Sequence, residues 1–287
     1  MLNSLVNIGV GIIVLYAGYG VVGYSLSQFV VAVIYAVLYW HVGRKQIDFS
    51  HLKGRILKQD IKDVVSKGIG YLASPLWQSI YFQGGTFVVR IVLGAESVAM
   101  FNTLRAVCRS VNQIYSIINA SLFPEMQFEY GKGNLILVRL LFRMAIDTCF
   151  FVALAGCGLL LLCGLDVYSW WTNGELDAPY SVWFLFVMGT GINAVWWTAG
   201  MIYRMVNKPY HFAMITTLMA VVSILVSYIL SGYYGLWGAA MGTVVFELVV
   251  ALYVLPDTCK LLNMRMSDLY THVGEDWRMI YKKLQKR

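Results

Sequence analysis

Charged residues are scarce in this sequence. Only 13% of its 287 residues are Asp, Glu, Lys or Arg, whereas 59% are hydrophobic and the mean hydropathy is +0.65. Soluble domains carry roughly 25% charged residues, so this chain lacks the polar surface that water requires. The composition excludes a soluble globular protein and predicts an all-α, polytopic bundle of transmembrane helices.

The sequence also lacks the patterns of metal sites, disulfides and soluble catalysis. Its five cysteines form no C-x-x-C pair and its four histidines are scattered, so we expect neither a disulfide framework nor a metal site. It contains no G-x-S-x-G turn, no Walker loop and no H-E-x-x-H helix. We therefore expect a protein that is not an enzyme and that needs no cofactor.

The start of the sequence does not predict a cleavable signal peptide either. Met1 leads directly into apolar sequence, without a basic n-region or a small-residue cleavage site. We expect the first helix to be retained as a signal anchor or to follow further sequence. Since a span needs about 20 predominantly apolar residues, hydropathy predicts about eight spans, at 2–17, 20–40, 70–91, 98–122, 138–162, 180–203, 212–230 and 236–255.

The basic residues lie on one side of these predicted spans. The loop 44–67, the tail from 260 and two shorter connections hold 19 of the 22 Lys and Arg residues, and the opposite connections, including a predicted outer loop at 165–179, hold none. The positive-inside rule then predicts a multi-pass protein of the inner (plasma) membrane with both termini in the cytoplasm. This placement accounts for the net charge of +7, so we expect membrane lipids and no nucleic acid as partners.

A short motif occurs twice and suggests an internal repeat. Tyr19-Gly20-Val21-Val22-Gly23 opens the second span, and Tyr234-Gly235-Leu236-Trp237-Gly238 opens the eighth. Glycine at such positions allows a tight hairpin between adjacent helices. If the two hairpins are equivalent, the repeat unit has six helices and the first unit lacks four. The predicted organisation is a hairpin at 1–42, a cytoplasmic amphipathic linker at 43–68, a six-helix lobe at 69–255 and a basic tail at 256–287.

Three arginines do not lie on the inner side. Arg90 ends the third span, whereas Arg105 and Arg109 lie within the fourth. On a helix, these two share an arc of roughly 100° with four neutral polar residues, which are Asn102, Asn112, Ser116 and Asn119. Arginine inside a bilayer is costly and usually faces protein or an aqueous cavity. The stripe predicts an electropositive cavity that binds an anionic group. The alternative is that the arginines only pair with Asp147 or Glu247, or that Arg90 reaches lipid phosphate.

Other polar residues within the spans have competing interpretations. Arg143 and Asp147 are four residues apart and form either a local ion pair or part of a coupling path. Glu247 is isolated in the eighth span and is either a proton-titrating group or a partner for a cavity arginine. Trp196-Trp197 lies close to Asn193. We expect these two tryptophans to pack in the core rather than to stack against sugar rings.

The segment 87–133 resembles the central part of the multidrug/oligosaccharidyl-lipid/polysaccharide exporter superfamily, and most closely its polysaccharide-biosynthesis (O-antigen type) flippases. The residues on which this resemblance rests are Leu93-Gly94-Ala95 with Val98 and Phe101, then Phe123-Pro124-Glu125 and Tyr130-Gly131-Lys132-Gly133-Asn134. Phe101 stands where the family often has tyrosine. Such flippases usually have twelve or more helices, so we expect four helices of the first lobe to be missing here, and a separate chain could supply them.

The resemblance implies transport of a polyprenyl-pyrophosphate-linked oligosaccharide to the outer leaflet by alternating access. It implies that Arg105 and Arg109 neutralise the pyrophosphate or acidic sugars, and that Arg90 lies at the outer mouth. It also implies that Asn102, Asn112 and Ser116 contact polar groups. A cation-coupled exporter of small amphipathic compounds and a non-functional remnant are the alternatives. The first of these needs acids in the cavity, whereas the polar stripe is basic.

Overall fold

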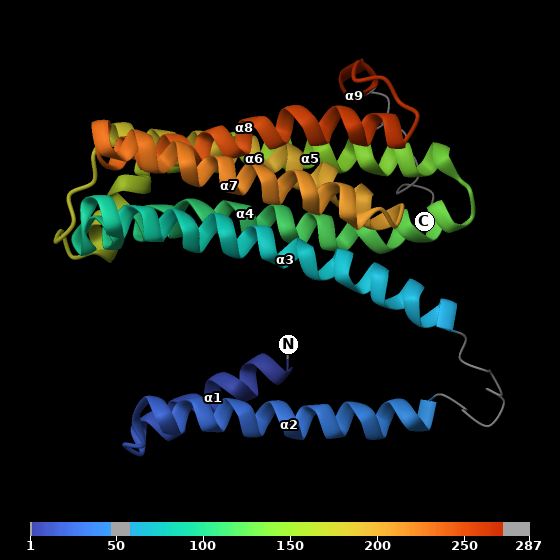
Figure 1. Cartoon of the computed structure of the whole chain (residues 1–287), viewed down its shortest axis with the longest axis horizontal. Coiled ribbons are helices and arrows are strands. Elements are labelled where there is room, and N and C mark those ends of the chain that lie inside the picture. The colour runs from blue at the N-terminus through green and yellow to red at the C-terminus, as the bar shows by residue number, and fades with distance from the viewer. Residues whose placement is uncertain (1, 47–57, 272–287) are drawn as a thin grey trace, which may run out of the picture. The chain divides into compact units, whose positions relative to one another are not determined.

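The computed structural model describes residues 2–46 and 58–271, and within these ranges the chain is helical without a strand. Figure 1 shows the helices in chain order. Their bounds are α1 Leu2–Tyr16, α2 Gly20–Gln46, α3 Lys58–Leu93, α4 Ala95–Gly131, α5 Leu135–Trp171, α6 Tyr180–Met205, α7 Pro209–Tyr234, α8 Leu236–Leu261 and α9 Asp268–Thr271. The predicted all-α fold class is confirmed, and each predicted span coincides with one of the first eight helices.

Within the described residues, five helices are long and apolar enough to cross a membrane, and they are α2, α5, α6, α7 and α8. The apolar part of α1 is shorter, at Val6–Tyr16. The helices α3 and α4 have 36 and 37 residues, which at 1.5 Å per residue is more than a bilayer requires. They carry more polar residues than the other five, among them the basic start of α3 and the polar stripe of α4.

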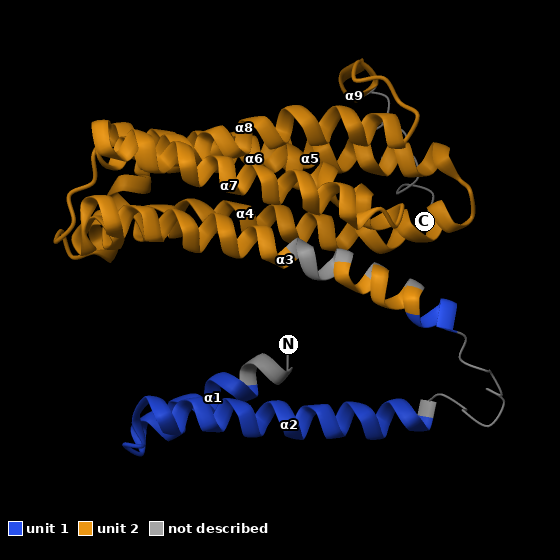
Figure 2. Ribbon diagram, viewed as in Figure 1, with its two compact units in different colours: residues 1–61 blue, residues 62–287 orange. Residues whose placement is uncertain are grey.

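The chain divides into two compact units, residues 1–61 and 62–287 (Figure 2). The first contains the α1–α2 hairpin, in which the Gln28 side chain donates a hydrogen bond to the carbonyl oxygen of Asn7 over 3.0 Å. The second contains the bundle α4–α8 and nearly all of α3. The predicted linker at 43–68 is described only at its ends, where 43–46 close α2 and 58–68 begin α3.

The first glycine has a similar φ angle in both copies of the repeated motif. Gly20 and Gly235 both have positive φ angles, of +60° and +58°, a region that glycine occupies without strain. A Cβ atom at Gly23 would collide with the Tyr19 side chain, and one at Gly238 would collide with the backbone of Leu230. Each motif therefore uses one glycine for the turn and another for close approach. Equivalence of the whole hairpins stays a prediction.

The α7–α8 hairpin shows how the close approach is stabilised. The Ser223 hydroxyl donates to the Gly242 carbonyl oxygen over 2.7 Å, and the Ser227 hydroxyl donates to that of Ala239 over 3.1 Å. In lipid, helices associate through small residues and interhelical hydrogen bonds rather than through a hydrophobic driving force. The α7–α8 hairpin has both the small residues and the interhelical hydrogen bonds.

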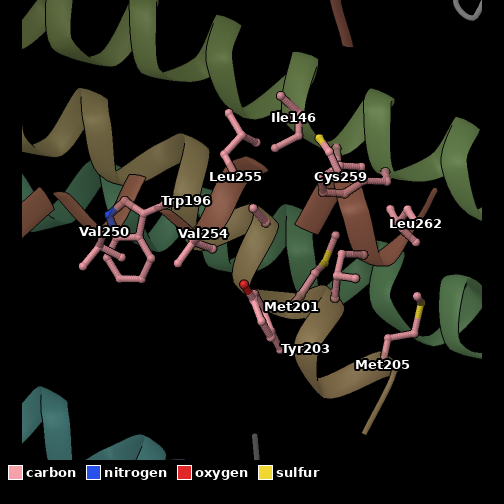
Figure 3. Close-up of a cluster of buried hydrophobic side chains, with 14 of the residues drawn as sticks. Ile146, Trp196, Met201, Tyr203, Met205, Val250, Val254, Leu255, Cys259 and Leu262 are labelled. Carbon is pink, nitrogen blue, oxygen red and sulfur yellow. The ribbon is translucent and has the colours of Figure 1, made fainter. Parts of the chain in front are cut away.

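Large side chains fill the interior of the second unit. One cluster joins α5, α6 and α8, with Trp196, Met201 and Val250 among its fully buried members (Figure 3). A second cluster also includes residues of α4, with Phe101 of α4 and Trp183 of α6 among its buried members. The Trp183 indole N–H donates to the Leu160 carbonyl oxygen over 3.1 Å, so α5 and α6 are joined by packing and by a hydrogen bond.

Two predicted boundaries differ from the structure. The outer loop predicted at 165–179 is shorter, because α5 continues to Trp171. The predicted tail from 256 begins inside α8, which continues to Leu261 past Pro256. Both differences arise because hydropathy detects the hydrocarbon-spanning part of a helix, whereas the backbone hydrogen bonds continue beyond it. The rest of the tail, from 272, lies outside the described residues.

Candidate functional site

A cavity of about 600 Å³ opens among α3, α4, α6 and α8. Its volume is within the range of small-molecule sites, which is roughly 300–1,000 Å³. The lining consists of Trp77, Gln78, Tyr81, Phe82, Arg105, Ala106, Cys108, Arg109, Asn112, Gln113, Ser116, Ile117, Phe186, Gly189, Thr190, Asn193, Trp197, Thr243 and Glu247.

Arg105 is fixed in the wall of this cavity. Its Nη2 atom donates to the Phe82 carbonyl oxygen, the Thr86 hydroxyl and the Asn102 amide oxygen over 3.2, 2.9 and 2.7 Å. The guanidinium carbon lies 5.2 Å from the ring centroid of Phe82 and 5.1 Å from that of Phe101. Its other amino group, Nη1, is buried and has no partner in the described part of the chain. Arg105 therefore joins α3 to α4 and retains one donor group.

Arg109 is held far less tightly. Its guanidinium carbon lies 4.3 Å from the centroid of the Phe82 ring, a distance suited to a cation–π contact. The side chain is exposed and lines the cavity. Within the described residues no hydrogen bond to it is seen. Its guanidinium N–H groups are therefore available to a ligand, and a guanidinium fork matches carboxylate or phosphate oxygens.

Glu247 on α8 accepts hydrogen bonds from two other helices. Its Oε1 accepts from the Tyr81 hydroxyl of α3 over 3.2 Å, and its Oε2 accepts from the Asn193 amide and the Trp196 indole of α6 over 3.0 and 2.6 Å. The residue is only 7% exposed. All three partners are donors, so the arrangement suits a carboxylate that accepts from them. Glu247 therefore holds α3, α6 and α8 together at the cavity wall.

The other predicted site residues fall into two groups. Asn112 and Ser116 line the cavity together with Arg105 and Arg109. Asn102 is not among the lining residues, and its amide oxygen accepts a hydrogen bond from Arg105. The remaining three, Arg90, Arg143 and Asp147, are not among the lining residues. Arg90 is exposed at the end of α3, and Asp147 is buried on α5.

Sequence reasoning missed the role of Phe82. Its ring lies under both guanidinium groups and its carbonyl accepts from Arg105, yet one phenylalanine among 14 gives no local signal. The two residues of the Trp196-Trp197 pair have different environments, since Trp196 is fully buried in the core whereas Trp197 lines the cavity. No cluster of three or more His, Cys, Asp or Glu that could hold a metal ion occurs in the ranges that the structure covers.

Comparison with known proteins places the fold. Residues 1–127 match the family model described as polysaccharide biosynthesis protein. No curated protein matches the chain. Among solved structures, it is similar to a MATE protein in the bent conformation, with a TM-score of 0.77 and 19% identity over 91% of this chain and 61% of that one.

Two further structures support the same fold. An outward-facing multidrug resistance MATE family transporter of the MOP superfamily matches with a TM-score of 0.76 and 20% identity, over 91% of this chain and 61% of that one. A MOP superfamily transporter from Pyrococcus furiosus matches with a TM-score of 0.73 and 16% identity, over 91% and 62%. The chain has the MATE-like helical fold and spans about six-tenths of the length of these structures.

Proposed function

We propose that this protein is a flippase that translocates a polyprenyl-pyrophosphate-linked oligosaccharide for the synthesis of a cell-surface polysaccharide. The observation that carries the proposal is the exposed guanidinium of Arg109 in a cavity within the helical bundle. Positive charge in such a position is costly in a membrane protein and indicates a function. The family model at 1–127, which describes polysaccharide biosynthesis proteins, supports the choice of substrate.

The two arginines have different tasks in this proposal. Arg105 and Arg109 are one helical turn apart on α4, about 6 Å along the axis. Arg109 binds phosphate oxygens directly, because none of its donors is used by another of the residues that the structure describes. Arg105 contributes its buried charge and its remaining amino group while it keeps α3 beside α4. Both guanidinium groups form strong, charge-assisted hydrogen bonds with phosphate. Because like charges repel, the same two groups discriminate against cationic compounds.

A cation-coupled exporter of small amphipathic compounds is the second candidate. The similarity to a multidrug resistance MATE transporter favours it, as does the carboxyl group of Glu247 at the cavity. However, this carboxyl group already accepts three hydrogen bonds, and the cavity arginines repel a cation. One similar transporter is described as having a binding pocket of reverse polarity, which suggests a different function, so proteins with this fold do not all have the same pocket polarity.

A binding experiment distinguishes the two candidates. The full chain in lipid nanodiscs should bind a farnesyl-pyrophosphate-linked disaccharide, with an affinity that falls as salt is added, because salt screens the attraction between charges. It should bind ethidium at least tenfold more weakly. Arg109→Gln should weaken the binding of the pyrophosphate compound and leave ethidium unaffected. Binding of ethidium without binding of the pyrophosphate compound would favour the exporter.

We also propose that the protein lies in the inner membrane with both termini cytoplasmic, on the basis of the distribution of Lys and Arg. In a variant whose five native cysteines are replaced, cysteines introduced singly at Lys132 and Thr172 should label differently. An impermeant reagent added to intact cells should modify the cysteine at 172 and leave the one at 132 unmodified. The reverse pattern would show that the orientation is inverted.

A further inference from the structure

The cavity has a charged part and a neutral part. Along α4, the arginines come first and are followed within two turns by Asn112, Gln113 and Ser116. The helix α3 runs antiparallel to α4, as the contact of Thr86 with Asn102 and that of Phe82 with Arg105 show. Trp77 and Gln78 therefore lie near the level of Asn112. We define the neutral part as Trp77, Gln78, Asn112, Gln113 and Trp197, all of which line the cavity.

Aromatic rings form one wall of this neutral part. The Trp77 ring is 2% exposed and lies stacked 5.5 Å from Phe246, which fixes it firmly. The Trp197 ring meets Trp77 edge to face, with 6.3 Å between centroids, and is half-buried. Trp197 thus presents an accessible ring that a buried neighbour holds in place.

Two buried polar atoms of the neutral part lack a partner. The indole N–H of Trp77 is a donor, the Oδ1 atom of Asn112 is an acceptor, and neither has a hydrogen bond in the part of the chain that the structure describes. Such atoms are rare in native proteins, since each costs about 1–3 kcal/mol. A donor and an acceptor on facing helices, beside an accessible aromatic ring, indicate a ligand that both donates and accepts hydrogen bonds.

We propose that the neutral part is a carbohydrate subsite that binds a pyranose ring of the cargo. This inference rests on the proposed function and deepens it. One face of a pyranose consists of C–H groups, which pack on the negative face of an aromatic ring such as Trp197. Its hydroxyls both donate and accept, and so do the amides of Gln78, Asn112 and Gln113. A lipid tail would leave the Trp77 N–H without a partner, and a second phosphate would lack a cation there.

The cavity then determines the orientation of the cargo. The pyrophosphate binds at Arg109, and the adjoining sugar extends along α4 toward Ser116. The distance from Arg109 to Ser116 along the helix axis is about 10 Å at 1.5 Å per residue, which leaves room for sugar beyond the phosphates. The geometry therefore assigns recognition of the anion to one end of the cavity and recognition of the sugar to the other.

Three probes test the subsite in the full chain in nanodiscs. They are farnesyl pyrophosphate without sugar, a farnesyl-pyrophosphate-linked disaccharide, and a dodecyl disaccharide without phosphate. Trp197→Ala should weaken binding of both sugar-bearing probes about tenfold, which is 1.4 kcal/mol, and leave farnesyl pyrophosphate unchanged. Trp197→Phe keeps a ring and should retain most of the affinity. Gln78→Ala should weaken the sugar-bearing probes several-fold.

The matched control is Trp170→Ala, because Trp170 is 81% exposed near the end of α5 and does not line the cavity. It should bind all three probes as the unmodified chain does. Equal losses for all probes in Trp197→Ala, no loss for any of them, or failure of both sugar-bearing probes to bind the unmodified chain would overturn the subsite. If the dodecyl disaccharide binds through Trp197 while farnesyl pyrophosphate does not bind, the subsite stands and the anionic part of the proposed function fails.

Discussion

Arg109→Ala is expected to abolish export of the lipid-linked glycan while the protein still folds. The Arg109 side chain is exposed in the cavity and makes no hydrogen bond within the described chain, so its removal leaves no protein group without a partner. A hydrogen bond to a charged group contributes about 1.5–3 kcal/mol, which corresponds to a loss of about 10- to 100-fold in affinity for a phosphate group. Arg109→Lys should retain part of the export, because lysine keeps the charge but not the planar fork.

Export would be measured as surface polysaccharide in cells whose polysaccharide depends on this protein. Arg90→Ala is the matched control, since Arg90 is exposed and lies outside the cavity lining, and it should leave export close to normal. Full export by Arg109→Ala at normal protein levels would refute the anionic cavity. Arg105→Ala is less informative, because it also breaks the hydrogen bonds that join α3 to α4.

Glu247→Ala should cause the largest loss of stability. The substitution leaves the Tyr81 hydroxyl, the Asn193 amide and the Trp196 indole without their shared acceptor. Each buried donor without a partner costs about 1–3 kcal/mol, so we expect a total loss of roughly 3 kcal/mol or more. It would be measured as a lower unfolding temperature of the purified protein in detergent.

Glu247→Gln should lose less, because the amide oxygen still accepts from two of the three donors. Glu175→Ala is the control, since Glu175 is exposed in the connection between α5 and α6, and it should unfold at the normal temperature. An unchanged unfolding temperature in Glu247→Ala would show that the three hydrogen bonds do not hold the helices together. Retained stability with lost export would instead assign Glu247 a role in transport.

Composition and periodicity were sufficient to predict much of this protein. The scarcity of charge predicted a helical membrane protein, and apolar runs located the helices α1 to α8. The arc of six polar residues on the fourth span follows from the helical repeat of a single segment. Four of the six, Arg105, Arg109, Asn112 and Ser116, line the cavity, whereas Asn102 and Asn119 are not among the lining residues. Such features are local, because they depend on neighbours within two turns of one helix.

The tertiary structure decided how those residues differ from one another. Arg105 and Arg109 are equivalent in the sequence pattern, but the Phe82 carbonyl and Thr86 of α3 fix only the first of them. Glu247 is isolated in its own helix, and its partners come from positions that are 51 to 166 residues away. Trp196 and Trp197 are adjacent in the chain, yet only the second lines the cavity. A helix determines its own faces through its backbone geometry, whereas the groups that meet each face depend on how separate helices pack together.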